Sequence, residues 1–125
     1  MKALDIKERL LAESKNYYLT GSSEEVNLYR KSDDKHLACV GDFYGDPNDA
    51  LIDQDERFCI SVGCGYILYR LNEPFQSYQY DVESCQWTEE GRGPDNIDWY
   101  DKVEQISSNE LVLTDEAGNK RILKV

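Results

Sequence analysis

The longest apolar run of the chain, residues 57–71, constrains the fold more than any other segment. If this run is extended backbone, its side chains alternate between two faces, and one face holds Phe58, Ile60, Val62, Cys64, Tyr66 and Leu68. The run is longer than a usual strand, and Gly63 and Gly65 lie near its middle. The sequence therefore predicts two strands, or one long coiled strand, with a bend or bulge near these glycines.

Gly63 and Gly65 are also successive positions on the other face of the run. Two missing side chains leave room for a crossing helix, an aromatic ring or a ligand, and the sequence does not choose between them. Packing is the more common reason for such glycines, so we interpret the run first as a scaffold for the core.

The composition indicates one globular unit. A chain of 125 residues is the size of a single domain, which we expect to cover residues 1–125. The mean hydropathy is -0.69, and no apolar run approaches the roughly 20 residues that a membrane-spanning helix needs. Charges interrupt the N-terminal segment, which therefore lacks the apolar stretch of a signal peptide. These features predict a cytoplasmic protein without a membrane partner.

Two segments carry helix signals. Asp5 and Glu8 have the spacing of a capping box, which predicts an N-terminal helix from there through about Lys15. Ile6, Leu10 and Tyr17 recur near helical spacing in and just after this segment. Farther along, Asp46 before Pro47 fits an N-cap with proline at the first helical position, which predicts a short helix over residues 47–54.

The other segments favour strands. Besides the apolar run, we expect strands at residues 26–30, 36–44, 77–82, 85–88, 100–106, 110–114 and 120–125. Short turn signals separate the last three, which predicts a three-stranded antiparallel meander. The predicted fold class is α+β, mainly β: an antiparallel sheet or partly open β-barrel of about seven to nine strands, with the N-terminal helix and one short helix.

The residues carry no catalytic or metal-binding signature. The chain has no Cys-x-x-Cys pair, so we expect free structural thiols at Cys39, Cys59, Cys64 and Cys85. His36 is the only histidine, and in a strand it would face away from Cys39. Residues 42–55 are rich in oxygen ligands, but the spacing of a calcium loop is absent. We therefore predict no enzyme activity, no cofactor and no metal.

The net charge of -11 is concentrated in two segments. Residues 33–56 hold eight acids against Lys35 alone, and residues 81–104 hold eight acids against Arg92 and Lys102. These segments flank the apolar run, and the second contains residues 89–98, which we expect to form a mobile surface loop. Loops on opposite flanks of one strand can converge at one end of a sheet, where their electrostatic fields add.

A converged acidic face would attract a basic protein at a raised association rate. Trp87, Trp99 and Tyr100 border the second acidic segment, and such residues are common interface anchors. Nucleic acid is an unsuitable direct partner, because phosphate binding requires a basic patch. The predicted partner-binding residues are Asp46, Asp49, Asp53, Asp55, Glu56, Glu89, Glu90, Asp95, Asp98, Trp99 and Tyr100.

With their aromatic neighbours, the acidic segments 42–56 and 89–101 resemble in general character the small acidic immunity proteins of bacterial contact-dependent and other polymorphic toxin systems. The resemblance implies a cytoplasmic inhibitor bound one to one to a cognate toxin domain, often a basic nuclease. It would plug the active site or cap a nearby surface. Its acids would pair with toxin lysines and arginines, and Trp99 or Tyr100 would supply the desolvated anchor.

Two other hypotheses remain open. A β-barrel could bind a small ligand in an apolar pocket lined by Tyr66, Tyr69 and Tyr78. An enzyme of unknown chemistry would instead gather His36 and carboxyl groups of raised pKa in a cleft.

Overall fold

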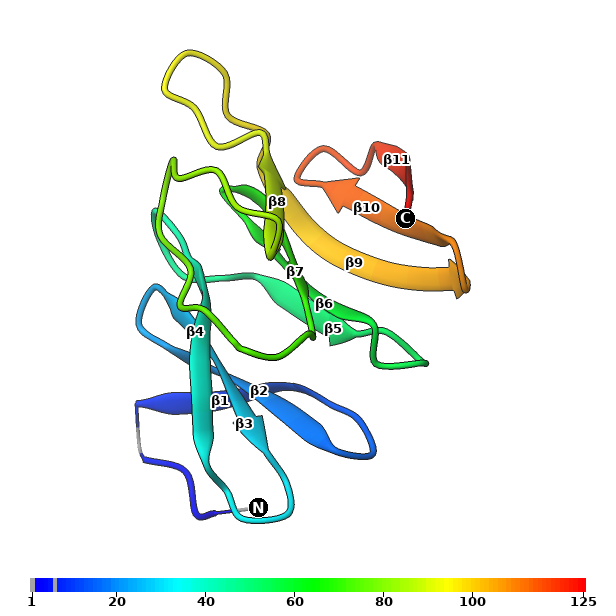
Figure 1. Ribbon diagram of the computed structural model, residues 1–125. Coiled ribbons are helices and arrows are strands. Elements are labelled where there is room, and N and C mark those ends of the chain that lie inside the picture. Colours follow the sequence, from blue (N-terminus) through cyan, green and yellow to red (C-terminus); the bar gives the residue numbers. More distant parts are fainter. Residues whose placement is uncertain (1, 6) are drawn as a thin grey trace.

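The computed structural model describes residues 2–5 and 7–125, which form eleven strands in three antiparallel sheets (Figure 1). The first sheet has the order β1-β2-β3-β4 and consists of β1 (Glu8–Glu13), β2 (Tyr17–Ser22), β3 (Glu25–Arg30) and β4 (His36–Asp42). The central sheet has the order β5-β6-β7-β8 and consists of β5 (Asp49–Ile52), β6 (Phe58–Gly63), β7 (Gly65–Arg70) and β8 (Trp87–Glu90). The C-terminal meander has the order β11-β10-β9 and consists of β9 (Tyr100–Ser107), β10 (Glu110–Asp115) and β11 (Lys120–Lys124).

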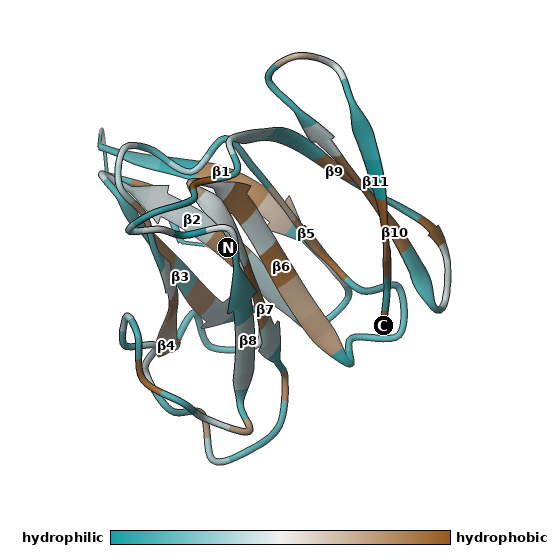
Figure 2. Cartoon of the chain, turned by 90° about the horizontal axis from the view of Figure 1, so that it is seen from above, coloured by the Kyte–Doolittle hydropathy of each residue, from teal (hydrophilic) through white to brown (hydrophobic). Residues whose placement is uncertain are grey.

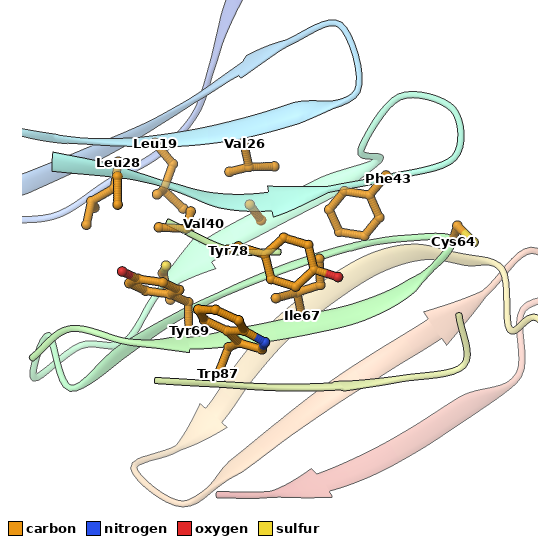
Figure 3. Close-up of a cluster of buried hydrophobic side chains, with 13 residues drawn as sticks. Leu19, Val26, Leu28, Val40, Phe43, Cys64, Ile67, Tyr69, Tyr78 and Trp87 are labelled. Atoms are coloured by element: carbon orange, nitrogen blue, oxygen red, sulfur yellow. The ribbon is translucent and has the colours of Figure 1, made fainter. Parts of the chain in front are cut away.

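The central sheet is buried on both faces, because the first sheet lies on one side of it and the meander on the other (Figure 2). In the first core, its side chains pack with residues of the first sheet such as Leu19, Val26, Leu28 and Val40 (Figure 3). In the second core, the opposite face packs with Val103, Leu111 and Leu113 of the meander. This two-sided burial explains why residues 57–71 lack the polar alternation of a strand with one solvent face.

β6 and β7 form one hairpin, so the two strands predicted for the apolar run are confirmed. Cys64 lies at the turn and packs in the first core, whereas Phe58 and Ile60 belong to the second. Gly65 has a φ of +72°, which favours glycine, and a Cβ there would overlap the carbonyl oxygen of Glu90. The room expected at this glycine is therefore filled by the chain itself.

The predicted N-terminal helix is wrong, because residues 8–13 form β1 and pair with β2. The capping-box contact does exist: the amide of Asp5 donates to the Glu8 carboxylate at 3.3 Å. It closes a turn that leads into a strand. Leu11 packs against the first core, and this burial on a sheet outweighs the local helix preference. Ile6, part of the expected helical stripe, lies outside the described residues.

The predicted short helix over residues 47–54 is also wrong, because this segment contains β5, which pairs with β6. Ala50 belongs to the first core and Leu51 packs against the second. Asp49 accepts a hydrogen bond from the amide of Val103 at 3.0 Å and ties β5 to β9. An extended segment places successive side chains on opposite sides, so it can contact both layers at once.

The remaining strand predictions are mixed. The hairpin of β3 and β4 and the C-terminal meander are confirmed. Residues 77–82 form no strand. The amide of Tyr78 donates a hydrogen bond to the carbonyl of Cys39 at 2.8 Å, but this bond is not part of a strand ladder. With β1, β2 and β5 added, the α+β prediction of about seven to nine strands gives way to an all-β fold. Across residues 2–5 and 7–125 there is no helix of the length and hydropathy needed to cross a membrane.

Candidate protein-interaction face

Arg92 joins several connections at the end of the molecule that carries the β6–β7 turn. Its Nη1 donates to the carbonyl of Cys64 at 2.7 Å, its Nη2 donates to the carbonyl of Asp42, and its Nε donates to the Glu89 carboxylate at 2.9 Å. The side chain is 7% exposed. The Glu89 carboxylate and the two carbonyls compensate the buried charge, so the end of β4, the turn and the β8–β9 connection are held together.

Three aromatic rings surround the same guanidinium. Its central carbon lies 4.8 Å from the ring centroid of Phe43, 5.5 Å from that of Tyr80 and 5.9 Å from that of Tyr78. These distances are those of cation–π contacts. Tyr78 and Tyr80 belong to the β7–β8 connection, which is thereby held against the same end, and Figure 3 shows Phe43, Tyr78 and Cys64 on this side of the first core.

Backbone pairs also order the β8–β9 connection. The amide of Gly65 donates to the carbonyl of Asp98 at 2.6 Å, and Cys64 forms an isolated bridge with Trp99. A second bridge joins Arg92 to Ile97. The segment expected to be a mobile loop therefore begins in β8, is joined to the turn at its base and projects beyond the sheets as a small hairpin (Figure 1).

A hollow of about 470 Å³ opens at this end. It is lined by Glu24, Asp42, Phe43, Tyr44, Cys64, Tyr80, Arg92 and Ile97. Tyr44 is 77% exposed, Tyr80 52% and Ile97 38%. We call the surrounding surface the turn-end face: Glu24 with residues 42–46, 80–83 and 91–98. It carries seven acids against Arg92 alone, namely Glu24, Asp42, Asp46, Asp81, Glu83, Asp95 and Asp98.

Only part of the predicted partner-binding set lies on this face. Asp46, Asp95 and Asp98 are exposed there. Trp99 is half-buried against the first core, and Glu89 is half-buried, where it accepts from Arg92 and, at 2.6 Å, from the Tyr78 hydroxyl. The two acidic segments therefore do meet at one end, but with fewer of their acids than the sequence predicted.

Asp53 is at the opposite end of the β6–β7 hairpin, in the connection between β5 and β6, and is fully buried. It accepts hydrogen bonds from the side chain and amide of Arg57 and from Gln105 Nε2 at 2.7 Å. Burial alone would raise the pKa of Asp53, but these bonds outweigh it and lower the pKa to about 2. This carboxylate stabilises the fold and is not presented to a partner.

The acids next to Asp53 differ in whether they form bonds within the fold or remain exposed. Glu56 accepts from the Ser14 hydroxyl and, at 2.9 Å, from the amide of Asn16, which ties this connection to the β1–β2 turn. Asp55 is exposed at the same end, away from the turn-end face. Tyr100, which we expected to be an anchor, is 5% exposed in the second core.

Glu90 links a side chain of the central sheet to a side chain of the meander. The Tyr66 hydroxyl donates to its carboxylate, and Arg121 Nη2 donates to it at 3.0 Å. The bond from Tyr66 lowers the pKa of Glu90, whereas burial and the same bond raise the pKa of Tyr66. Glu90, like Asp49, therefore has a structural role between the sheets.

Sequence reasoning missed several residues of the hollow. The signal for Arg92 was present, since a single arginine among many acids is a candidate for an internal ion pair. Tyr44 and Asp42 lay within the first acidic segment but were not selected. Glu24 lies outside both acidic segments and gave no signal; only the pairing of β3 with β4 brings it beside the hollow.

The residues behind the two other hypotheses are separated. Tyr66 belongs to the second core, whereas Tyr69 and Tyr78 belong to the first, so the three do not line one pocket. His36 is exposed and contacts the Asn27 amide oxygen at 2.9 Å. Every carboxyl group with a resolved pKa shift in the described chain is shifted downward. No group of three or more His, Cys, Asp or Glu side chains is placed to hold a metal within residues 2–5 and 7–125.

The chain matches no protein-family model, and no curated protein matches it.

Proposed function

We propose that the protein is an immunity-type inhibitor, acting in the cytoplasm, that neutralises a cognate basic toxin domain by binding it through the turn-end face. The observation that best supports this function is the arrangement around Arg92, which holds parts of both acidic segments together. Acids surround exposed Tyr44, Tyr80 and Ile97 there. An apolar, aromatic centre with a charged rim is the usual anatomy of a protein interface.

The charge supports a basic partner. Seven acids on one face of a protein with net charge -11 attract a cation-rich surface and repel nucleic acid. A nuclease domain that binds nucleic acid through a basic groove would have the complementary charge. The association rate constant should therefore be high at low salt and should fall as the salt concentration increases.

The order of the face also favours tight binding. The hydrogen bonds of Arg92 and the backbone bond between Gly65 and Asp98 fix the loops before any partner arrives. A pre-organised surface loses less conformational entropy on association than a mobile loop would.

The lowered pKa values of the carboxyl groups favour a binding role over a catalytic one. Glu56 and Glu90 have lowered pKa values, as does Asp53. Such groups stay ionised at neutral pH, whereas a general acid needs a raised pKa.

The test is to examine the genes adjacent to that of this protein for an encoded toxin domain and to co-express the two proteins. The wild-type chain should restore growth and bind the toxin one to one. The double reversal Asp46→Lys with Asp95→Lys should slow association about tenfold or more and flatten its salt dependence, because both side chains are exposed on the turn-end face.

The matched control is Asp55→Lys with Glu104→Lys, which changes the net charge equally at exposed positions away from that face. It should retain protection and most of the association rate. If the wild-type chain gives no protection, the proposed function is wrong. If the two double variants have equal effects, the assignment of the face is wrong.

A further inference from the structure

Building on the proposed function, we infer that the hollow of the turn-end face receives one arginine side chain of the partner. Its guanidinium packs against the rings of Tyr44 and Tyr80 and pairs with the carboxylates of Glu24 and Asp42. This arginine is the anchor of the interface, whereas the other exposed acids steer the approach.

The walls of the hollow suit a planar cation. Tyr44 and Tyr80 are more than half exposed, so a guest can reach both rings even though Arg92 lies over the Tyr80 ring. Both residues line the hollow together with Glu24 and Asp42. Glu24 is fixed because its Oε2 accepts from the amide of Gly45 at 2.6 Å, and its Oε1 accepts no bond within the described chain. Exposed rings beside a positioned carboxylate are the groups that bind guanidinium.

The protein itself already places a guanidinium in this environment. Arg92 lies under the hollow with Phe43 and Tyr80 around it. Because Arg92 is paired with Glu89 at 2.9 Å and nearly buried, its charge is compensated within the protein. A second, external guanidinium therefore meets the carboxylates of Glu24 and Asp42, which form no ion pair within the described chain, rather than an uncompensated cation.

Other occupants fit the charge less well. A second copy of the chain would bring another net charge of -11 and would be repelled, as would any anion. Lysine carries a compact, strongly hydrated charge that stacks poorly on rings. Arginine is planar, less hydrated and able to form two parallel bonds with a carboxylate.

The first test uses N-acetyl-arginine amide as a probe in nuclear magnetic resonance titrations of the full chain. The amide signals of Tyr44, Gly45, Tyr80 and Ile97 should shift and saturate. N-acetyl-lysine amide should bind at least threefold more weakly, and the uncharged N-acetyl-citrulline amide should cause no saturable shift. Equal binding of the citrulline probe, tighter binding of tetramethylammonium, or no saturable shift with the arginine probe would overturn the inference.

The second test is Tyr44→Ser, with Ile122→Ser as the control at an exposed position of the meander. Tyr44→Ser should abolish probe binding and weaken toxin binding tenfold or more, whereas Ile122→Ser should change neither. Toxin binding could be unchanged in Tyr44→Ser but lost in the double variant Asp46→Lys with Asp95→Lys. This result would refute the arginine site and leave the proposed function in place. Probe binding without any toxin binding would refute the function and keep the site.

Discussion

The two ends of the β6–β7 hairpin both carry acids, but they use them differently. At the end where β6 begins, Asp53 is buried and bonded to Arg57, and Glu56 is bonded to the β1–β2 turn. At the turn end the buried charged group is a cation: Arg92 donates to two backbone carbonyls and to Glu89. The exposed acids there surround a hollow that the fold leaves open.

This difference separates two roles of charge in one protein. A carboxylate that accepts several hydrogen bonds in the interior stabilises the fold and is unavailable to a partner. An exposed carboxylate adds little to stability and can pair with an incoming cation. Counting acids along the sequence treats both kinds alike, so the candidate face is defined by burial rather than by charge density.

The largest expected effect is that of Gly65→Ala at the turn end. Alanine there combines a positive φ with overlap against the backbone of Glu90 and Gly91, so the free energy of unfolding should fall by about 3–5 kcal/mol. Gly118→Ala is the control, because its φ of +87° is similar but a Cβ meets nothing within 4 Å; its loss should be about 1 kcal/mol. Urea unfolding measures both. Equal losses would mean that the close approach at Gly65 is unimportant.

Replacing Arg92 should have the next largest effect. Arg92→Met removes the donor to two carbonyls and leaves Glu89 with only the Tyr78 hydroxyl as a donor within the described chain, so the free energy of unfolding should fall by about 2–3 kcal/mol. Amide hydrogen exchange should accelerate in residues 91–98 and stay unchanged in residues 53–57. The control is Arg121→Met, whose side chain is 42% exposed beside Glu90 and should contribute less than about 1 kcal/mol. A similar loss in both variants would argue against the special role of Arg92.

At the opposite end, Asp53→Asn should lower the free energy of unfolding by about 2 kcal/mol at neutral pH. The pKa of Asp53 is lowered to about 2 in the folded protein, against about 3.9 in an unfolded chain. Its stabilisation is therefore complete above about pH 5 and is lost as the pH falls toward 2. Denaturant unfolding of wild type and variant at several pH values should show the difference between them shrinking over this range. A difference that is independent of pH would contradict the ionised role of Asp53.

The smallest effect on stability is expected for Tyr44→Ser. Because Tyr44 is 77% exposed, the free energy of unfolding should change by less than about 0.5 kcal/mol, while partner binding weakens. Thermal and urea unfolding check the first part. A loss above about 1 kcal/mol would show that Tyr44 stabilises the fold and would weaken its assignment to the open face.

The strands that the sequence predicted well share strong local signals. Residues 57–71 form a long apolar run with glycines at its middle, and it became the β6–β7 hairpin. Short turns with alternating strands likewise identified the meander of β9, β10 and β11. In both cases the strands pair with their nearest neighbours in the chain, so local pattern and tertiary pairing agree.

The two helix predictions failed where local and tertiary preferences conflict. Asp5 and Glu8 make the contact of a capping box, yet β1 follows it because β2 offers a pairing partner and the first core buries Leu11. Asp49 lies within the segment predicted to be the short helix, yet it accepts a hydrogen bond from the amide of Val103 in the meander. The first core that buries Leu11 is assembled from several strands, and Val103 is distant from Asp49 in the chain, so neither contact can be read from the local sequence.

The candidate site was predicted in part. The convergence of the acidic segments follows from their position on either side of one hairpin, and Asp46, Asp95 and Asp98 do lie at its turn end. The acids of residues 53–56 lie at the other end, because β6 runs the full length of the central sheet between the two groups.

By itself, the sequence determined the doubly buried hairpin and the excess of negative charge on its flanks, because both depend on residue types that are contiguous in the chain. Only the tertiary structure decided which acids remain open to a partner. That choice depends on how packing places each donor. Gln105 reaches Asp53 from the meander, whereas Arg57 and Arg92 are near Asp53 and Glu89 in the chain and are held in place by further bonds to the carbonyls of Ser108 and Cys64. The turn end carries the open acids because its connections bury one arginine and leave the surrounding carboxylates in solvent.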